Sequence, residues 1–156
     1  MPIRQRAKKR GGAPRNRLIP LETTGHGFRV IRLARESPAS ARLVVIHLGE
    51  TLLIPLSEIR LITTERNYVL VHSSGEPARA RGPLRALMAL LDQRFFRVRR
   101  EAVVNLERVV RVSANGGHGQ LLLHMDDGTS TTSGRDYSPA VRARLLGGNR
   151  LRAQRA

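Results

Sequence analysis

Short runs of apolar and β-branched residues, separated by clusters of turn residues, make up most of the chain from residue 28 onward. Runs of about four to eight such residues between Gly, Pro, Asn, Asp or Ser are typical of β-strands. They predict strands over residues 28–33, 42–48, 51–54, 59–64, 68–72, 78–81, 95–100, 103–106, 109–112, 120–125 and 129–133. The Asp126-Asp127-Gly128 step between the last two is a strong hairpin signal. The pattern therefore predicts a mostly antiparallel β domain.

Helical periodicity is confined to two short segments. Pro83 suits a first helical turn, because its φ is preset and no needed N–H is lost. The apolar residues after it recur three and four apart, at Leu84, Leu87, Met88 and Leu91. This spacing predicts one helix of about three turns, ending near residue 93, whose apolar stripe packs on the core. A second short helix is expected over residues 139–146. Long helices do not alternate with the strands, so a Rossmann-type or barrel enzyme is not expected.

The chain has 156 residues and a formal net charge of +16, most of it near the two ends. Residues 1–35 carry ten Lys and Arg against one acid, and residues 142–156 carry five Arg and no acid. Residues 36–141, by contrast, hold thirteen Arg against eleven acids. Basic tails bind polyanions through counterion release, without reading sequence. Nucleic acid is therefore favoured over tails that are merely solvated.

The charge distribution also divides the chain. A basic flexible arm is expected at residues 1–25, a folded domain at 26–146 and a basic C-terminal tail at 147–156. The basic start is not followed by an apolar segment, and no apolar run reaches about 18 residues. Neither a secretory signal nor a membrane span is expected, which predicts a cytoplasmic protein without a membrane partner.

Side-chain constellations for catalysis or metal binding are not found in the sequence. Cys is absent, which excludes disulfides, thiolate metal sites and Cys nucleophiles. The five His have no tight metal-ligand spacing, and no nucleophile or phosphate-loop motif occurs. We expect no enzyme activity, no metal, no cofactor and no small-molecule substrate.

One segment combines apolar anchors with a dense arginine cluster. Residues 94–100 read Arg-Phe-Phe-Arg-Val-Arg-Arg, with four Arg in seven residues. If alternate apolar side chains face the core, the Arg side chains between them face outward from a fixed backbone. A guanidinium grips phosphate with two parallel hydrogen bonds, or spans the O6 and N7 acceptors of guanine. The alternative, an exposed and solvated arginine face, stays open on composition alone.

Five motifs follow one another along the body of the chain. They are Ile54-Pro55-Leu56-Ser57-Glu58-Ile59, Glu65-Arg66-Asn67-Tyr68-Val69, Arg81-Gly82-Pro83-Leu84, Phe95-Phe96-Arg97-Val98-Arg99-Arg100-Glu101-Ala102-Val103-Val104-Asn105 and Ser133-Gly134-Arg135-Asp136-Tyr137. In order and spacing they resemble the LytTR-type DNA-binding domain, the output module of many bacterial response regulators. The fourth is similar to that family's F-x-R-x-H-R-S-x-x-V-N core, its most specific motif. The resemblance covers about residues 41–146.

This resemblance implies an elongated antiparallel β-sandwich of about ten short strands in three sheets, with one short helix and flanking basic tails. Loops and strand ends of such a domain enter two successive major grooves and usually bend the duplex. By position, base contacts fall to Asn67, Arg100 and Arg135. Arg97 and Arg99 lie on the central reading strand and are expected to contact phosphate. Asn105 is expected to hold the strand turn.

Two positions depart from the family pattern. Arg99 stands where His is common, and Glu101 stands where Ser is common. An acid at that position repels phosphate, and an ion pair with Arg97 or Arg100 would compensate. No receiver domain fits before residue 41, so the chain is interpreted as a free-standing output domain or a fragment. Control would then come from expression level, a partner, or homodimerisation on repeated sites.

The leading hypothesis is a sequence-specific regulator of transcription that binds double-stranded DNA at promoter repeats. The alternative is a non-specific nucleic-acid or structured-RNA-binding protein that uses its basic tails. The chain has only three Phe and two Tyr, and no Trp, for stacking on unpaired bases. That scarcity disfavours single-strand binding more than duplex binding.

Overall fold

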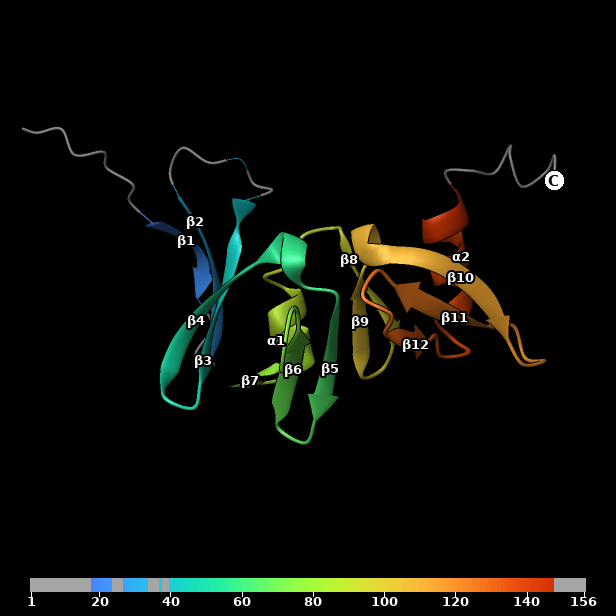
Figure 1. Ribbon diagram of the computed structural model, residues 1–156, viewed down its shortest axis with the longest axis horizontal. Helices are drawn as coiled ribbons and strands as arrows, with labels where there is room; N and C mark the ends of the chain where they lie inside the picture. The colour runs from blue at the N-terminus through green and yellow to red at the C-terminus, as the bar shows by residue number, and fades with distance from the viewer. Residues whose placement is uncertain (1–17, 24–26, 34–36, 38–39, 148–156) are drawn as a thin grey trace, which may run out of the picture.

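The computed structural model of the protein describes residues 18–23, 27–33, 37 and 40–147. Within these ranges the strands form three antiparallel sheets, which follow one another along the long axis of the molecule (Figure 1). The first sheet has the order β1-β2-β3-β4. Its strands are β1 (Leu18–Thr23), β2 (Phe28–Leu33), β3 (Arg42–His47) and β4 (Glu50–Pro55).

The second sheet lies in the middle of the molecule and has the order β7-β6-β5-β9-β8. A 3-10 turn, η2 (Leu56–Glu58), leads into it. Its elements are β5 (Leu61–Glu65), β6 (Tyr68–His72), β7 (Ala78–Arg81), α1 (Leu84–Met88), β8 (Phe95–Arg99) and β9 (Ala102–Asn105). After η3 (Leu106–Arg108), the third sheet consists of β10 (Val109–Asn115), β11 (Gln120–Met125) and β12 (Ser130–Thr132), and α2 (Ser138–Leu146) follows. The predicted mostly β fold is confirmed.

Strand β9 of the central sheet is buried on both faces, which suits its short apolar run. All four residues of β9 are buried. Val103 belongs to the cluster shared with the first sheet, whereas Ala102 and Val104 belong to the cluster shared with the third. Successive strand residues point to opposite faces, so one short strand contributes to two cores. Any tilt of β9 is therefore resisted from both sides.

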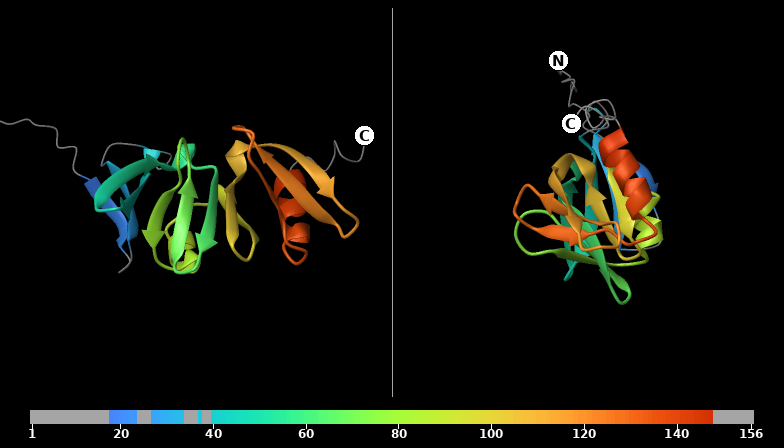
Figure 2. Two further views of the ribbon diagram at one scale, coloured as in Figure 1. Left: turned by 60° about the horizontal axis from the view of Figure 1, so that its bottom comes forward. Right: turned by 90° about the vertical axis from the view of Figure 1, so that its right-hand side faces the viewer.

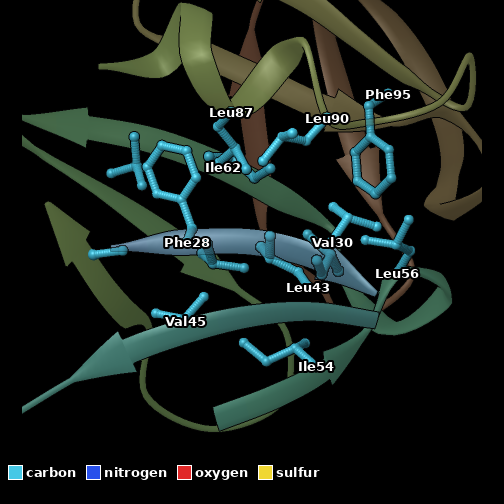
Figure 3. Close-up of a cluster of buried hydrophobic side chains, with 14 of the residues drawn as sticks. Phe28, Val30, Leu43, Val45, Ile54, Leu56, Ile62, Leu87, Leu90 and Phe95 are labelled. Atoms are coloured by element: carbon cyan, nitrogen blue, oxygen red, sulfur yellow. The ribbon is translucent and has the colours of Figure 1, made fainter. Parts of the chain in front are cut away.

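The larger core lies between the first and central sheets (Figure 3). Phe28 and Val30 of β2 and Leu43 and Val45 of β3 are at most 3% exposed. They pack with Ile62 and with other buried side chains of the central sheet and α1. Burying side chains of this size contributes about 1.5–3 kcal/mol each. β2 is therefore an integral part of the domain.

The expected arm at residues 1–25 needs a correction, because residues 18–23 form strand β1. β1 pairs with β2 from Leu18 opposite Leu33 to Thr23 opposite Arg29, with a bulge between Pro20 and Glu22. Proline is tolerated there because β1 stands at the end of the sheet order, where an edge strand has no second neighbour. Residues 1–17 of the predicted arm lie outside the described residues, as do residues 148–156 of the predicted tail.

The first helix is shorter than the predicted three turns. After Met88 the backbone bonds run between residues three apart, with the Leu90 amide donating to the Leu87 carbonyl at 2.9 Å. The buried positions are consequently Leu84, Leu87 and Leu90, while Met88 and Leu91 are half-buried beside the same core. Such 3-10 turns eclipse side chains at a spacing of three. The second helix matches its predicted range, and neither helix within the described ranges is long and apolar enough to span a membrane.

Candidate nucleic-acid interface

Asn67 lies in the two-residue turn between β5 and β6. Glu65 pairs with Tyr68 across the hairpin, so Arg66 and Asn67 form its tip. Arg66 has a φ of 57°, a left-handed conformation that the tight turn requires. The backbone carbonyl of Asn67 accepts a hydrogen bond of 3.0 Å from the Gly82 amide, and its side chain is exposed. The turn is thus held by its backbone while the amide side chain faces outward.

Arg100 lies in the turn between β8 and β9, at the same end of the central sheet. Thr63 of β5 pairs with Ala102 of β9, and the Thr64 amide donates to the carbonyl of Glu101 at 3.2 Å. The end of β5 that leads into Asn67 therefore lies beside the start of β9. In the left view of Figure 2 the β5–β6 and β8–β9 turns both lie at the lower edge, with the β12–α2 connection. We call these three connections, residues 66–67, 100–101 and 133–137, the loop edge.

A β-bulge in β8 separates two arginines that simple alternation would place together. Arg97 pairs with Val103, and Arg99 pairs with Ala102, so the register shifts between them. Paired residues share a face of the sheet. Arg97 consequently lies on the side of the first sheet and Arg99 on the side of the third. The alternation considered for this segment is therefore interrupted between Arg97 and Arg99, whose side chains lie on different faces.

The guanidinium of Arg97, on β8, hydrogen bonds to the backbone of the turn that follows the strand. Its Nε donates to the carbonyl oxygen of Arg100 at 3.1 Å, and its Nη2 donates to the same oxygen. The guanidinium of Arg100 itself is exposed. Arg97 thus holds the turn from which Arg100 projects.

Glu101 forms an ion pair with Arg99. Nε of Arg99 lies 3.8 Å from a carboxylate oxygen of Glu101, a loose ion pair in which the Nε atom is itself buried and has no hydrogen bond among the described residues. The expected compensating pair from Arg97 or Arg100 is therefore wrong: within the described residues, neither has an ion pair with Glu101. The bulge explains this, because it turns Arg99 away from the face of Arg97.

Arg135 follows Gly134 in the β12–α2 loop, which is tied to β8. The Gly134 amide donates to the Val98 carbonyl at 2.8 Å. A Cβ on Gly134 would lie 3.3 Å from the Cβ of Arg99, so a residue without a side chain suits this close approach. Beneath it, the buried hydroxyls of Ser133 and Ser138 are hydrogen bonded at 2.6 Å. Arg135 is exposed on this rigid base.

The arginines of the loop edge differ from those elsewhere in their partners. Across the described ranges, the guanidinium groups of Arg66, Arg100 and Arg135 make no hydrogen bond or ion pair. By contrast, Arg60 and Arg108 both bind Asp126, at 2.5 Å and 2.7 Å, at the start of the β11–β12 turn. Hydrogen bonds from Arg108 and then Arg60 hold the pKa of Asp126 below its usual value. The positive charge of the loop edge is not neutralised in this way.

Two hollows flank the exposed tips. One of about 330 Å³ is lined by Asn67, Arg66 and Arg81 among others. The other, of about 700 Å³, lies beside Arg135 and is lined by His118 and Arg142 as well as apolar side chains of α2.

Arg66, Arg81 and Arg142 were not predicted from the sequence as residues of the interface. Arg66 directly precedes Asn67 in the second motif, and its place in a turn between two strands could have indicated an exposed side chain. No cluster of three or more His, Cys, Asp or Glu in the described part of the chain could hold a metal.

Asn105, expected to be structural, is fully buried and bonded within the domain. Its Nδ2 donates to the carbonyl of Ile59 at 2.9 Å, and its Oδ1 accepts from the amide of Glu107 at 3.0 Å. It therefore joins the ends of β5 and β9 opposite the loop edge.

Comparisons with known proteins converge on one family. The family model described as LytTr DNA-binding domain matches residues 49–146. The Positive alginate biosynthesis regulatory protein of Pseudomonas aeruginosa is 38% identical over 92 residues, which are 58% of this chain and 37% of that relative. The chain thus matches little more than a third of that relative's length.

Among solved structures, the fold matches a LytTr DNA-binding domain from a methyl-accepting/DNA response regulator of Bacillus cereus. The TM-score is 0.61 with 20% identity, over 68% of this chain and 96% of that chain. At this identity the match concerns the fold. β1, β2 and β3 all precede the residues that the family model matches, so most of the first sheet lies outside that region.

Proposed function

The chain belongs to the LytTr DNA-binding domain family, and from this premise we propose that it is a sequence-specific regulator of transcription. In this proposal the loop edge reads double-stranded DNA. The observation that carries it is the placement of Asn67, Arg100 and Arg135 at the same end of the sheets, on turns held by backbone hydrogen bonds. Because the turns are already held, their backbones need no further ordering when the exposed side chains meet base edges.

In this proposal the side chains of Asn67, Arg100 and Arg135 read bases, and neighbouring arginines position the domain on the DNA. Arg100 and Arg135 suit guanine, because a guanidinium spans O6 and N7, and Asn67 suits adenine through N6 and N7. Arg66 and Arg142 line the hollows beside these side chains and have no ion pair among the described residues, so they suit phosphate oxygens. Arg99 contributes a weaker phosphate contact, since Glu101 offsets part of its charge.

The elongated shape supports contact with more than one groove. The loop edge runs along the long axis in the left view of Figure 2, so its connections meet the duplex at successive positions. Reading two major grooves in this way favours a bent duplex, and homodimers on promoter repeats would extend the footprint. Regulation of transcription is supported by the relative, whose name describes a positive regulator of alginate biosynthesis.

Selection of bound fragments from a random duplex pool, at a stated salt concentration, tests this function. We expect enrichment of one motif, with retention lost when that motif is scrambled. Competition with single-stranded DNA and RNA addresses the alternative of non-specific or structured-RNA binding through the basic tails. Equal competition by all three nucleic acids, without an enriched motif, would contradict the proposal in favour of the alternative.

A further inference from the structure

Arg97 was expected from the sequence to contact phosphate, yet its guanidinium faces its own backbone. Both Nε and Nη2 donate to the carbonyl oxygen of Arg100. That carbonyl lies in a turn just after a β-bulge, where the strand ladder offers it no partner. An unpaired carbonyl there would leave the turn free to change conformation.

The geometry points to Arg97 as a positioning residue: we propose that it fixes the β8–β9 turn so that the Arg100 side chain leaves the protein in the direction of a base pair. The inference rests on the proposed function, because it takes Arg100 as a reader of DNA. Arg97 of β8 and Arg100 of the following turn are both cations, and of the two only Arg100 is exposed with no partner for its guanidinium in the described part of the chain. In this role the two donors of the Arg97 guanidinium, and not its positive charge, hold the Arg100 carbonyl.

Arginine is suited to this role for a geometric reason. Its planar fork presents Nε–H and Nη–H in parallel, and here both converge on one oxygen. A lysine ammonium keeps the charge but has no fixed pair of parallel donors. The Arg97→Lys substitution therefore separates shape from charge, and Arg97→Ala removes both. Arg66→Ala is the matched control, because Arg66 lies in the neighbouring turn and its guanidinium has no partner among the residues that the structure describes.

The first experiment measures binding of the full chain to the duplex enriched from the random pool. A second duplex carries a substitution at the base pair whose discrimination Arg100→Ala abolishes. For Arg97→Ala and Arg97→Lys alike, we expect the affinity ratio between the two duplexes to fall roughly tenfold. The slope of log affinity against log salt should stay at the wild-type value. Arg66→Ala should keep the affinity ratio between the two duplexes, and its slope of log affinity against log salt should be shallower by about 0.9.

A phosphate contact gives the opposite pattern. If Arg97→Ala weakens both duplexes equally and loses about 0.9 of slope, while Arg97→Lys restores both, the positioning role is overturned. The second experiment needs no DNA: it measures amide hydrogen exchange in the free protein at Thr64, whose amide donates to the Glu101 carbonyl of this turn. Exchange should be faster in both Arg97 variants and unchanged in Arg66→Ala. Unchanged exchange in the Arg97 variants also overturns the role. If the wild-type chain selects no motif, the proposed function fails, and the exchange measurement still decides whether Arg97 holds the turn.

Discussion

The amide of Gly134 donates a 2.8 Å hydrogen bond to the carbonyl oxygen of Val98. Val98 is fully buried, two residues before Arg100, and Gly134 directly precedes Arg135. One bond thus joins the backbones that carry two candidate base readers from different sheets. The spacing between these readers is set by the packing of the central sheet against the third.

Substituting Gly134 should disturb that spacing. In Gly134→Ala the new Cβ would lie 3.3 Å from the Arg99 Cβ and 3.4 Å from the Tyr137 ring, so the loop must shift by a few tenths of an ångström. We expect weaker binding to the enriched duplex with little change in the salt slope, measured by fluorescence anisotropy. Gly117→Ala is the control, because a Cβ added there would have no neighbouring atom within 4 Å, and this variant should bind normally. Equal affinities for the two variants would contradict the coupling.

Removing the two arginine tips should relax discrimination at two different base pairs. Arg100→Ala and Arg135→Ala each lose a bidentate base contact, which costs about 1–3 kcal/mol on the preferred site and less on a substituted one. Competition titrations with single base-pair variants measure the loss. Because the loops share the Gly134–Val98 bond, the double variant should deviate from additivity. A uniform loss across all duplexes would instead identify phosphate contacts.

Much of the architecture could be predicted because short apolar runs between turn residues are a local signal. The hairpin at Asp126–Gly128 and the strand at Tyr68–His72 appear as expected. The order of motifs along the chain also located the turns of Asn67, Arg100 and Arg135. Pattern and motif order carry such information because each turn depends on a few neighbouring residues.

Non-local features were not predictable in the same way. The bulge in β8 depends on how Arg97 and Arg99 pair with β9, and the sequence alternation gives no sign of it. β1 was missed because Pro20 and the surrounding basic residues hide a strand that exists only by pairing with β2. The helix after Pro83 ends in a 3-10 turn, because Leu90 is buried in the core while Met88 is only half-buried beside it. In each case tertiary packing overrides the local pattern.

Asn105 should matter for stability rather than for contact with DNA. In Asn105→Ala the Ile59 carbonyl and the Glu107 amide lose their partner inside the domain. Leaving such groups unsatisfied costs about 1–3 kcal/mol, seen as a lower urea midpoint. Asn115→Ala is the control, since Asn115 makes no side-chain hydrogen bond within the described residues. Equal midpoints for the two variants would show that these bonds contribute nothing.

Asp126 should make stability depend on acid pH. Hydrogen bonds donated by Arg108 and Arg60 lower the pKa of the Asp126 carboxyl in the folded protein, whereas in the unfolded chain this pKa is about 3.9. The unfolded state therefore binds more protons below that pH, and the stabilisation present at neutral pH is lost as pH falls through the folded pKa. Asp126→Asn should cost about 1 kcal/mol at pH 7, modest because the pairs are partly exposed.

The difference in free energy of unfolding between wild type and Asp126→Asn should shrink below about pH 4. Urea unfolding at several pH values measures it. Glu50→Gln is the control, because Glu50 is exposed and has no ion pair in the described part of the chain. It should match wild type throughout. A deficit for Asp126→Asn that stays constant down to pH 2 would rule out the titration of this carboxyl as its cause.

The N-terminal charge can be separated from the N-terminal strand by two truncations. Residues 1–17 carry seven Lys and Arg and no acid, and β1 begins at Leu18. Deleting 1–17 should weaken all duplexes alike and flatten the salt slope, because fewer counterions are released, while the urea midpoint stays unchanged. Deleting 1–25 also removes β1 and exposes the edge of β2, so it should lower the midpoint as well. A sequence-selective loss on deleting 1–17 would mean that this segment reads bases, since pure charge neutralisation cannot distinguish one duplex from another.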